Sequence, residues 1–152
     1  MREILFRGKS VNDGNWVEGS LVITTIEPVD DTPIKHYHIE NMTIGVFPDE
    51  FQSGLSETVN PNTVGQFTGL TDKNGKRIFE GDVCRVTRPC VLAYGKITFE
   101  NGCFWFVDDG PGGMLRLCDA KMNGFQIEVI GNIHDNPELL EVPNGKDGFI
   151  KP

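Results

Sequence analysis

The strongest constraint on the fold is an alternation of short, β-prone apolar runs with turn residues, seen most clearly in residues 66–83. Asp72, Asn74 and Gly75 separate two runs rich in Phe, Thr, Ile and Val, and Asn-Gly is the pair that most readily takes two consecutive positive φ values. These residues predict a tight β-hairpin. Gly81 then interrupts the second run, which indicates a bulge or a sharp bend.

The rest of the chain follows the same pattern. Strands are expected at residues 3–9, 16–25, 34–39, 83–87, 92–100, 103–107 and 125–133. The clearest hairpin turns at Asn101-Gly102, and its second strand is apolar on both faces, so we expect that strand to be buried on both sides. Residues 40–62 read as a connector with at most one helical turn at 48–52, and Asn136-Pro137 favours a short helix at 136–141.

Several short strands with almost no helical periodicity indicate a mainly β fold. We expect a small SH3-like or related β-barrel from the C-terminal half, packed with or extended by an N-terminal β-hairpin, with few short helices. The domain would span residues 1–142, with sub-parts at 1–62 (hairpin and connector) and 63–142 (barrel). Residues 143–152 are expected to form a loose tail. Whether one core or two results is left open by the pattern.

The charge of the chain bears on its partners. The formal net charge is −8, from 22 acidic and 14 basic side chains, so the molecule as a whole should repel nucleic acid and anionic lipid. Residues 61–90 are the exception, with five basic and three acidic side chains. No apolar run is long enough for a membrane span or a signal peptide, and the four Cys form no paired CxxC frame. A reducing cytoplasm is therefore expected.

Several long phrases resemble one known family. They are residues 1–4 with Phe6-Arg7, residues 13–19, residues 59–70, residues 72–76 with 78–82, and the closing phrase at residues 129–140. Together they resemble the YopX family over most of the chain. The family typically has Tyr where Phe67, Phe79 and His134 stand, which argues against hydroxyl chemistry at those positions. The resemblance implies a small, largely β protein encoded by a bacteriophage or prophage, with no established catalytic activity and no active-site residues to transfer.

Motifs for catalysis or cofactor binding are not recognisable. His36 and His38 share one face of an expected strand and would need a third ligand to hold a metal, but no third ligand follows from spacing. No Walker loop, dinucleotide fingerprint, nucleophile elbow or zinc-protease motif occurs, and most Cys residues at apolar strand positions, such as Cys103, are expected to be core. We therefore predict no enzyme, no cofactor and no metal site; an unrecognised enzyme remains an alternative.

The leading hypothesis is a non-catalytic protein-interaction module that binds a host or phage protein, or a second copy of itself, through exposed strand edges and loops. The candidate binding residues lie in the positively charged stretch: Asp72, Lys73, Asn74, Lys76, Arg77 and Arg85. An alternative is single-stranded nucleic-acid binding, in which Lys73, Lys76, Arg77, Arg85 and Arg88 would lie beside Phe67 and Phe79. The net acidity of the chain disfavours this alternative.

Overall fold

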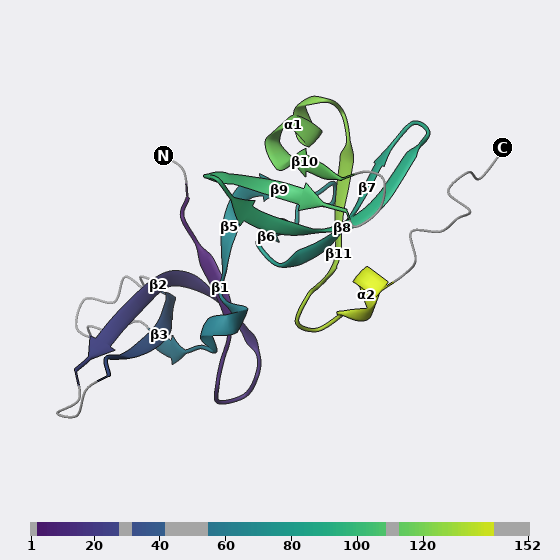
Figure 1. Ribbon diagram of the computed structural model, residues 1–152. Coiled ribbons are helices and arrows are strands. Elements are labelled where there is room, and N and C mark those ends of the chain that lie inside the picture. The colour runs from purple at the N-terminus through teal and green to yellow at the C-terminus, as the bar shows by residue number, and fades with distance from the viewer. Residues whose placement is uncertain (1–2, 28–31, 42–54, 109–112, 142–152) are drawn as a thin grey trace, which may run out of the picture. The chain divides into compact units, whose positions relative to one another are not determined.

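The computed structural model describes residues 3–27, 32–41, 55–108 and 113–141. The chain divides into two compact units, unit 1 at residues 1–66 and unit 2 at residues 67–152 (Figure 1). The expected tail at 143–152 and the expected helical turn at 48–52 lie outside the described residues. None of the described helices is long and apolar enough to cross a membrane.

Unit 1 is built on an antiparallel sheet with the strand order β4-β3-β2-β1-β5. Its elements are β1 (Phe6–Lys9), β2 (Trp16–Ile26), β3 (Ile34–Asn41), β4 (Leu55–Thr58), the 3-10 helix η1 (Pro61–Thr63) and the start of β5 (Gly65–Thr71). The predicted N-terminal hairpin is confirmed as β1–β2. β4 was not predicted, because its sequence Leu-Ser-Glu-Thr offers only one apolar residue to a strand pattern.

Close backbone approach and a few side chains hold unit 1 together. Ile39 and Val59 are its fully buried hydrophobic residues within the described part of the chain. A Cβ at Gly19 would lie 2.2 Å from the carbonyl oxygen of Glu40, so only glycine lets β2 and β3 approach at this position. The guanidinium of the buried Arg7 lies 4.7 Å from the ring centroid of Trp16, which is cation–π geometry.

Unit 2 contains the larger core. Beyond the rest of β5, its elements are β6 (Arg77–Phe79), β7 (Asp82–Arg88), β8 (Val91–Glu100), β9 (Cys103–Val107), β10 (Met114–Arg116), α1 (Leu117–Met122), β11 (Gln126–Asn132) and α2 (Glu138–Glu141). Five of these strands form an antiparallel sheet in the order β10-β9-β8-β7-β11, and α1 lies beside β10 in Figure 1. The two short helices are the only α-helices in the described residues.

The prediction of a mainly β fold is confirmed, but the barrel is not. Both sheets are open in the described part of the chain. A closed barrel would need β10 to pair with β11, but these are the two outer strands of the five-stranded sheet. β10 is only three residues long before the chain turns into α1, so it offers little edge to pair with β11. Leu117 and Ala120 of α1 instead complete the core over this sheet.

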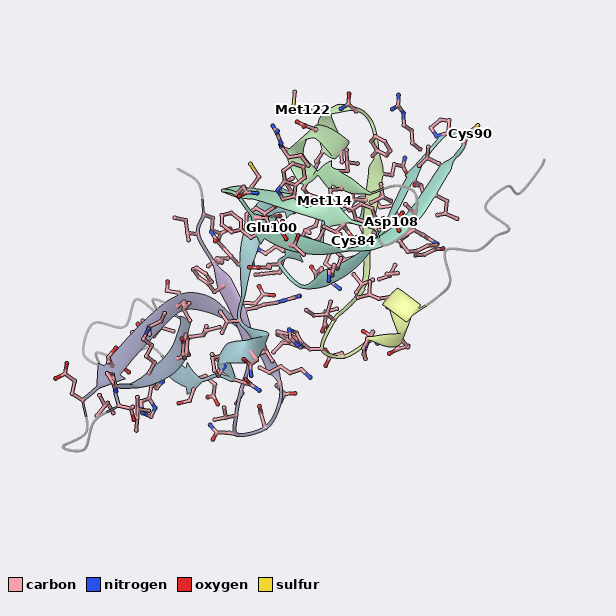
Figure 2. All side chains as sticks on the ribbon, viewed as in Figure 1. Cys84, Cys90, Glu100, Asp108, Met114 and Met122 are labelled. Atoms are coloured by element: carbon pink, nitrogen blue, oxygen red, sulfur yellow. The ribbon has the colours of Figure 1, made fainter. Side chains whose placement is uncertain are left out.

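One face of the five-stranded sheet builds the core. Cys84, Val86, Ile97, Phe106 and Ile127 share a buried cluster with Ile78 and the two α1 residues. Figure 2 shows Cys84 inside this sheet and Cys90 at the outer end of the β7–β8 hairpin. Because residues alternate along a strand, Trp105 lies on the opposite face from Phe106, and it is only half-buried. The prediction that residues 103–107 are buried on both sides is therefore wrong.

The two Asn-Gly turns differ. Asn101 and Gly102 both have positive φ, 51° and 77°, which confirms the predicted turn between β8 and β9. At the other site only Gly75 has positive φ (84°), so the prediction of two consecutive positive φ values is wrong there. Gly75 N–H donates to the carbonyl of Asp72 at 3.1 Å, so the turn starts two residues earlier than Asn-Gly. The predicted bend is confirmed at Gly81, with φ 81°.

Gly95 gives a test of this packing. A Cβ there would lie 2.2 Å from the carbonyl oxygen of Val107 and 2.9 Å from the Phe106 ring. Gly95→Ala should therefore lower the free energy of unfolding by about 1–3 kcal/mol, measured by urea denaturation. Leu92→Ala, at an exposed position of the same strand, is the control and should change it by less than about 0.5 kcal/mol. Equal stability of the two variants would contradict the close β8–β9 approach.

Candidate interaction surfaces

The tip of the β5–β6 hairpin is fastened to the outer edge of β11 by Asp72. The carboxylate of this buried residue (7% exposed) accepts hydrogen bonds from the backbone N–H groups of Asn74 (2.8 Å) and Lys76 (2.9 Å) through Oδ1. Its Oδ2 accepts from the N–H of Val129 at 3.1 Å. The N–H of Lys73 in turn donates to the carbonyl of Ile127 at 2.8 Å. Asp72, which the sequence groups with the candidate binding residues, forms a structural clamp within unit 2.

The clamp favours an ionised carboxylate. Burial alone would raise the pKa of Asp72, but hydrogen bonds from the N–H groups of Val129, Lys76 and Asn74 and the nearby charge of Lys76 lower it further than burial raises it. The net pKa lies below its ordinary value of 3.8. Because the folded-state pKa is depressed, the clamp stabilises the fold above the ordinary pKa, and this stabilisation is lost as the pH falls through the folded-state pKa.

Three charged residues meet beside the clamp. Lys73 Nζ lies 2.9 Å from Glu128 Oε2, and the Arg85 guanidinium hydrogen-bonds to the same oxygen. Hydrogen bonds from Lys73 and Arg85 lower the pKa of Glu128, and the Glu128 bond raises the pKa of Arg85, to which Tyr94 also contributes. The strand register places Arg85 opposite both Glu128 and Tyr94, so these three residues form one group across β11, β7 and β8, and Lys73 joins it from the hairpin tip.

Other bases surround the same hairpin. Lys121 of α1 donates from Nζ to the carbonyl of Thr71 at 2.9 Å, and Thr71 is paired with Arg77 across the hairpin. We call this surface the tip patch: Lys73, Lys76, Arg77, Arg85 and Lys121. Lys121, Tyr94 and Glu128 were not predicted as site residues, because only the strand register and the position of α1 bring them to the hairpin. The exposed side chain of Asn74 lies at the same tip.

The predicted aromatic part of the nucleic-acid alternative is wrong. Phe67 and Phe79 are buried, with ring centroids 5.5 Å apart, so they are core residues and offer no surface to a base. The Arg77 guanidinium lies 5.8 Å from the Phe67 centroid. Arg88 lies 5.2 Å from the Phe125 centroid.

The two histidines of unit 1 lie side by side on β3. Their rings stack with centroids 6.2 Å apart, and His38 Nδ1 is 3.2 Å from Thr58 Oγ1. The described ranges contain no group of three or more His, Cys, Asp or Glu arranged to hold a metal ion. The pair therefore gains no third ligand within these ranges.

A second surface lies on the β2–β3 ribbon, defined here as residues 20–26 of β2 with the paired residues of β3. The β1 register ends at Phe6↔Gly19, while β2 continues to Ile26 against β3. Within the described residues no strand pairs with this part of β2 on its other edge. Ile23, Ile26 and Ile34 on the ribbon are 50%, 54% and 51% exposed. Sequence reasoning missed this edge, although an uncharged, β-branched run of seven residues was its visible signal.

The two open antiparallel sheets define a small, mainly β protein whose open strand edge and basic hairpin are its distinctive surfaces. The family described as "YopX protein" matches residues 5–141, so the chain belongs to the YopX family. No curated protein matches it. Among solved structures it is similar to the crystal structure of protein EF1440 from Enterococcus faecalis, with 23% identity and a TM-score of 0.51 over 92% of this chain and 99% of that chain. That likeness concerns the fold alone.

The clamp can be tested by Asp72→Asn. The amide would place a donor group where a carboxylate oxygen now accepts a backbone N–H, so the free energy of unfolding at pH 7 should fall by about 1–3 kcal/mol. The difference from wild type should shrink as the pH falls through the depressed pKa of Asp72, measured by denaturant titration at several pH values. Asn74→Ala, an exposed change in the same turn, should leave stability nearly unchanged. A constant difference at all pH values would show that ionisation of Asp72 is not the cause.

Proposed function

We propose that this protein is a non-catalytic interaction module that takes up an extended segment of a partner protein at the β2–β3 ribbon. The observation that supports this most is the length of β2, which runs seven residues past its pairing with β1. An unpaired strand edge presents N–H and C=O groups ready for another strand, and strand addition is a common mode of peptide recognition. The exposed Ile23 and Ile26 lie on opposite faces of β2, so each would supply an apolar contact to the side chains on its own face of the added strand.

Charge specifies the chemistry of the added strand. Residues 20–26 carry no charged side chain, whereas Glu18 and Glu27 lie just before and just after them. Unit 1 as a whole has ten acidic and four basic residues. The best complement is therefore an uncharged, β-branched segment with basic residues at both ends.

A second copy of this chain fits less well. In an antiparallel β2–β2 pair centred on Ile23, Glu18 of each copy would lie one position from the residue opposite Glu27 of the other copy, so acidic residues would gather at both ends of the pair. Their like charges would repel one another, and both copies carry a net charge of −8. Self-association is therefore the weaker form of the proposal.

The biological setting is part of the same proposal. Membership in the YopX family supports an accessory protein of a bacteriophage or prophage that acts in the cytoplasm of the bacterial host. Such a protein would act by binding a host or phage protein rather than by catalysis.

Strand addition can be tested with two labelled peptides that share the core Val-Thr-Val-Thr-Val, one flanked by two Lys at each end and one by two Glu. Fluorescence anisotropy should show the Lys-flanked peptide binding at least about tenfold more tightly. Ile23→Lys should reduce its binding about tenfold or more, because a charge is placed in the apolar contact. Val91→Lys, the same change at a position 44% exposed in unit 2, is the matched control and should bind as wild type does.

Two further measurements complete this test. Hydrogen exchange at residues 20–26 should slow when the Lys-flanked peptide binds, and analytical ultracentrifugation should show a monomer of 16.9 kDa in its absence. If the protein is a dimer and Ile23→Lys dissociates it, the strand that adds to β2 comes from a second copy of this chain and not from a different protein. Equal binding by the Ile23→Lys and Val91→Lys variants, with no protection at residues 20–26, would rule out strand addition here.

A further inference from the structure

Burial changes the surface charge of the positively charged stretch. Residues 61–90 contain five bases and three acids, but two of the acids, Asp72 and Asp82, are buried. Both are used inside the fold: Asp72 clamps the hairpin tip, and the Asp82 carboxylate accepts the N–H of Phe79 at 2.8 Å. Glu80 is thus the remaining acid of the stretch against five bases. The surface of this stretch is more basic than its sequence indicates, in a chain whose net charge is −8.

The fold adds a further base and one acid to this surface. Lys121 comes from α1, where its Nζ reaches the carbonyl of Thr71 next to the clamp. Glu128 comes from β11 and contacts both Lys73 and Arg85. The tip patch therefore combines cations from the hairpin tip, β7 and α1, and Glu128 contacts two of them, Lys73 and Arg85. Because Glu128 holds Lys73 and Arg85 toward the same oxygen, it fixes two of the cations close together, although it also cancels one positive charge.

An aromatic ring lies beside these cations. Tyr94 is the partner of Arg85 in the β7–β8 register and shares its face of the sheet, opposite the face of Cys84 and Val86 that builds the core. Tyr94 is half-buried, in contrast to the fully enclosed Phe67 and Phe79. Cations that follow a phosphate backbone beside an aromatic ring that stacks on a base form the common pattern of single-strand binding.

We propose that the tip patch binds single-stranded nucleic acid, with the phosphates held by Lys73, Lys76, Arg77, Arg85 and Lys121 and one base stacked on Tyr94. This site lies within unit 2 and is independent of the β2–β3 ribbon. Binding is sequence-independent, because cations and a ring face do not distinguish bases. The net charge of the chain limits the affinity to the range of non-specific binding, about 1–100 µM at low salt.

The test is fluorescence anisotropy of the full chain with a labelled 20-nucleotide single strand of DNA at 50 mM salt. About four net contacts should give a slope near −3 for log K against log[salt], since each phosphate contact on a single strand contributes about −0.7. Lys76→Glu should weaken binding about five- to tenfold and flatten the slope. Lys35→Glu makes the same change of charge at an exposed position of unit 1 and should alter binding less than about twofold.

Two more variants separate this site from a general attraction to polyanions. Glu128→Gln removes the carboxylate between Lys73 and Arg85, so it should tighten binding about threefold, which loss of a structural contact alone would not do. Tyr94→Ala should weaken DNA binding about fivefold or more and leave binding of heparin, which has no bases, unchanged. Thermal denaturation confirms that each variant is folded.

Three results would overturn the proposal. They are equal loss of binding in Lys76→Glu and Lys35→Glu, weaker binding by Glu128→Gln, and a Tyr94→Ala variant that binds DNA as wild type does. Absence of any anisotropy change at 50 mM salt with folded wild-type protein would overturn it as well. None of these results bears on strand addition at the β2–β3 ribbon, because that test uses uncharged peptide cores and a different variant.

Discussion

Within unit 2, the Asp72 carboxylate holds the β5–β6 hairpin against β11, and the hairpin tip depends on this contact for its shape. Three backbone N–H groups donate to it, two from the turn itself and one from Val129. The same contact covers the outer edge of β11, since Lys73 N–H also donates to Ile127. A covered edge cannot pair with another chain. The clamp also makes the surface of the tip more basic, because the acidic residue of the turn, Asp72, is buried.

The two units treat their strand edges in opposite ways. In unit 2 the edge of β11 is closed by the hairpin tip, and the surface beside it is basic. In unit 1 the edge of β2 remains unpaired among the described residues over residues 20–26, without a charged side chain, within a unit that is strongly acidic. An edge without a local partner or a charge to block it is the part of a β protein most ready to accept a strand. This difference is why we propose strand addition at β2 and anion binding at the tip patch.

The sequence predicted much of the strand pattern and only part of the candidate site. Lys73, Lys76, Arg77 and Arg85 were identified from local charge and do lie at the tip patch. Asp72 was grouped with them because it is polar and lies in a turn, but its role depends on Val129, which is 57 residues away in the chain. Glu128, Lys121 and Tyr94 could not be assigned without the register of β7 with β8 and β11 and the position of α1. The exposure of the β2 edge depends likewise on where β1 stops.

By itself the sequence determined a mainly β fold, its turns at Asn101-Gly102 and Gly81, and membership in the YopX family, because turn chemistry, strand alternation and the long family phrases are local signals. Tertiary structure alone decided that the second sheet stays open, that Phe67 and Phe79 are core, and which acids are buried. These depend on contacts between segments far apart in the chain, which no local pattern specifies. The charge of a surface also depends on contacts between distant segments. The sequence gives the number of acidic residues, but only packing determines that Asp72 and Asp82 are buried.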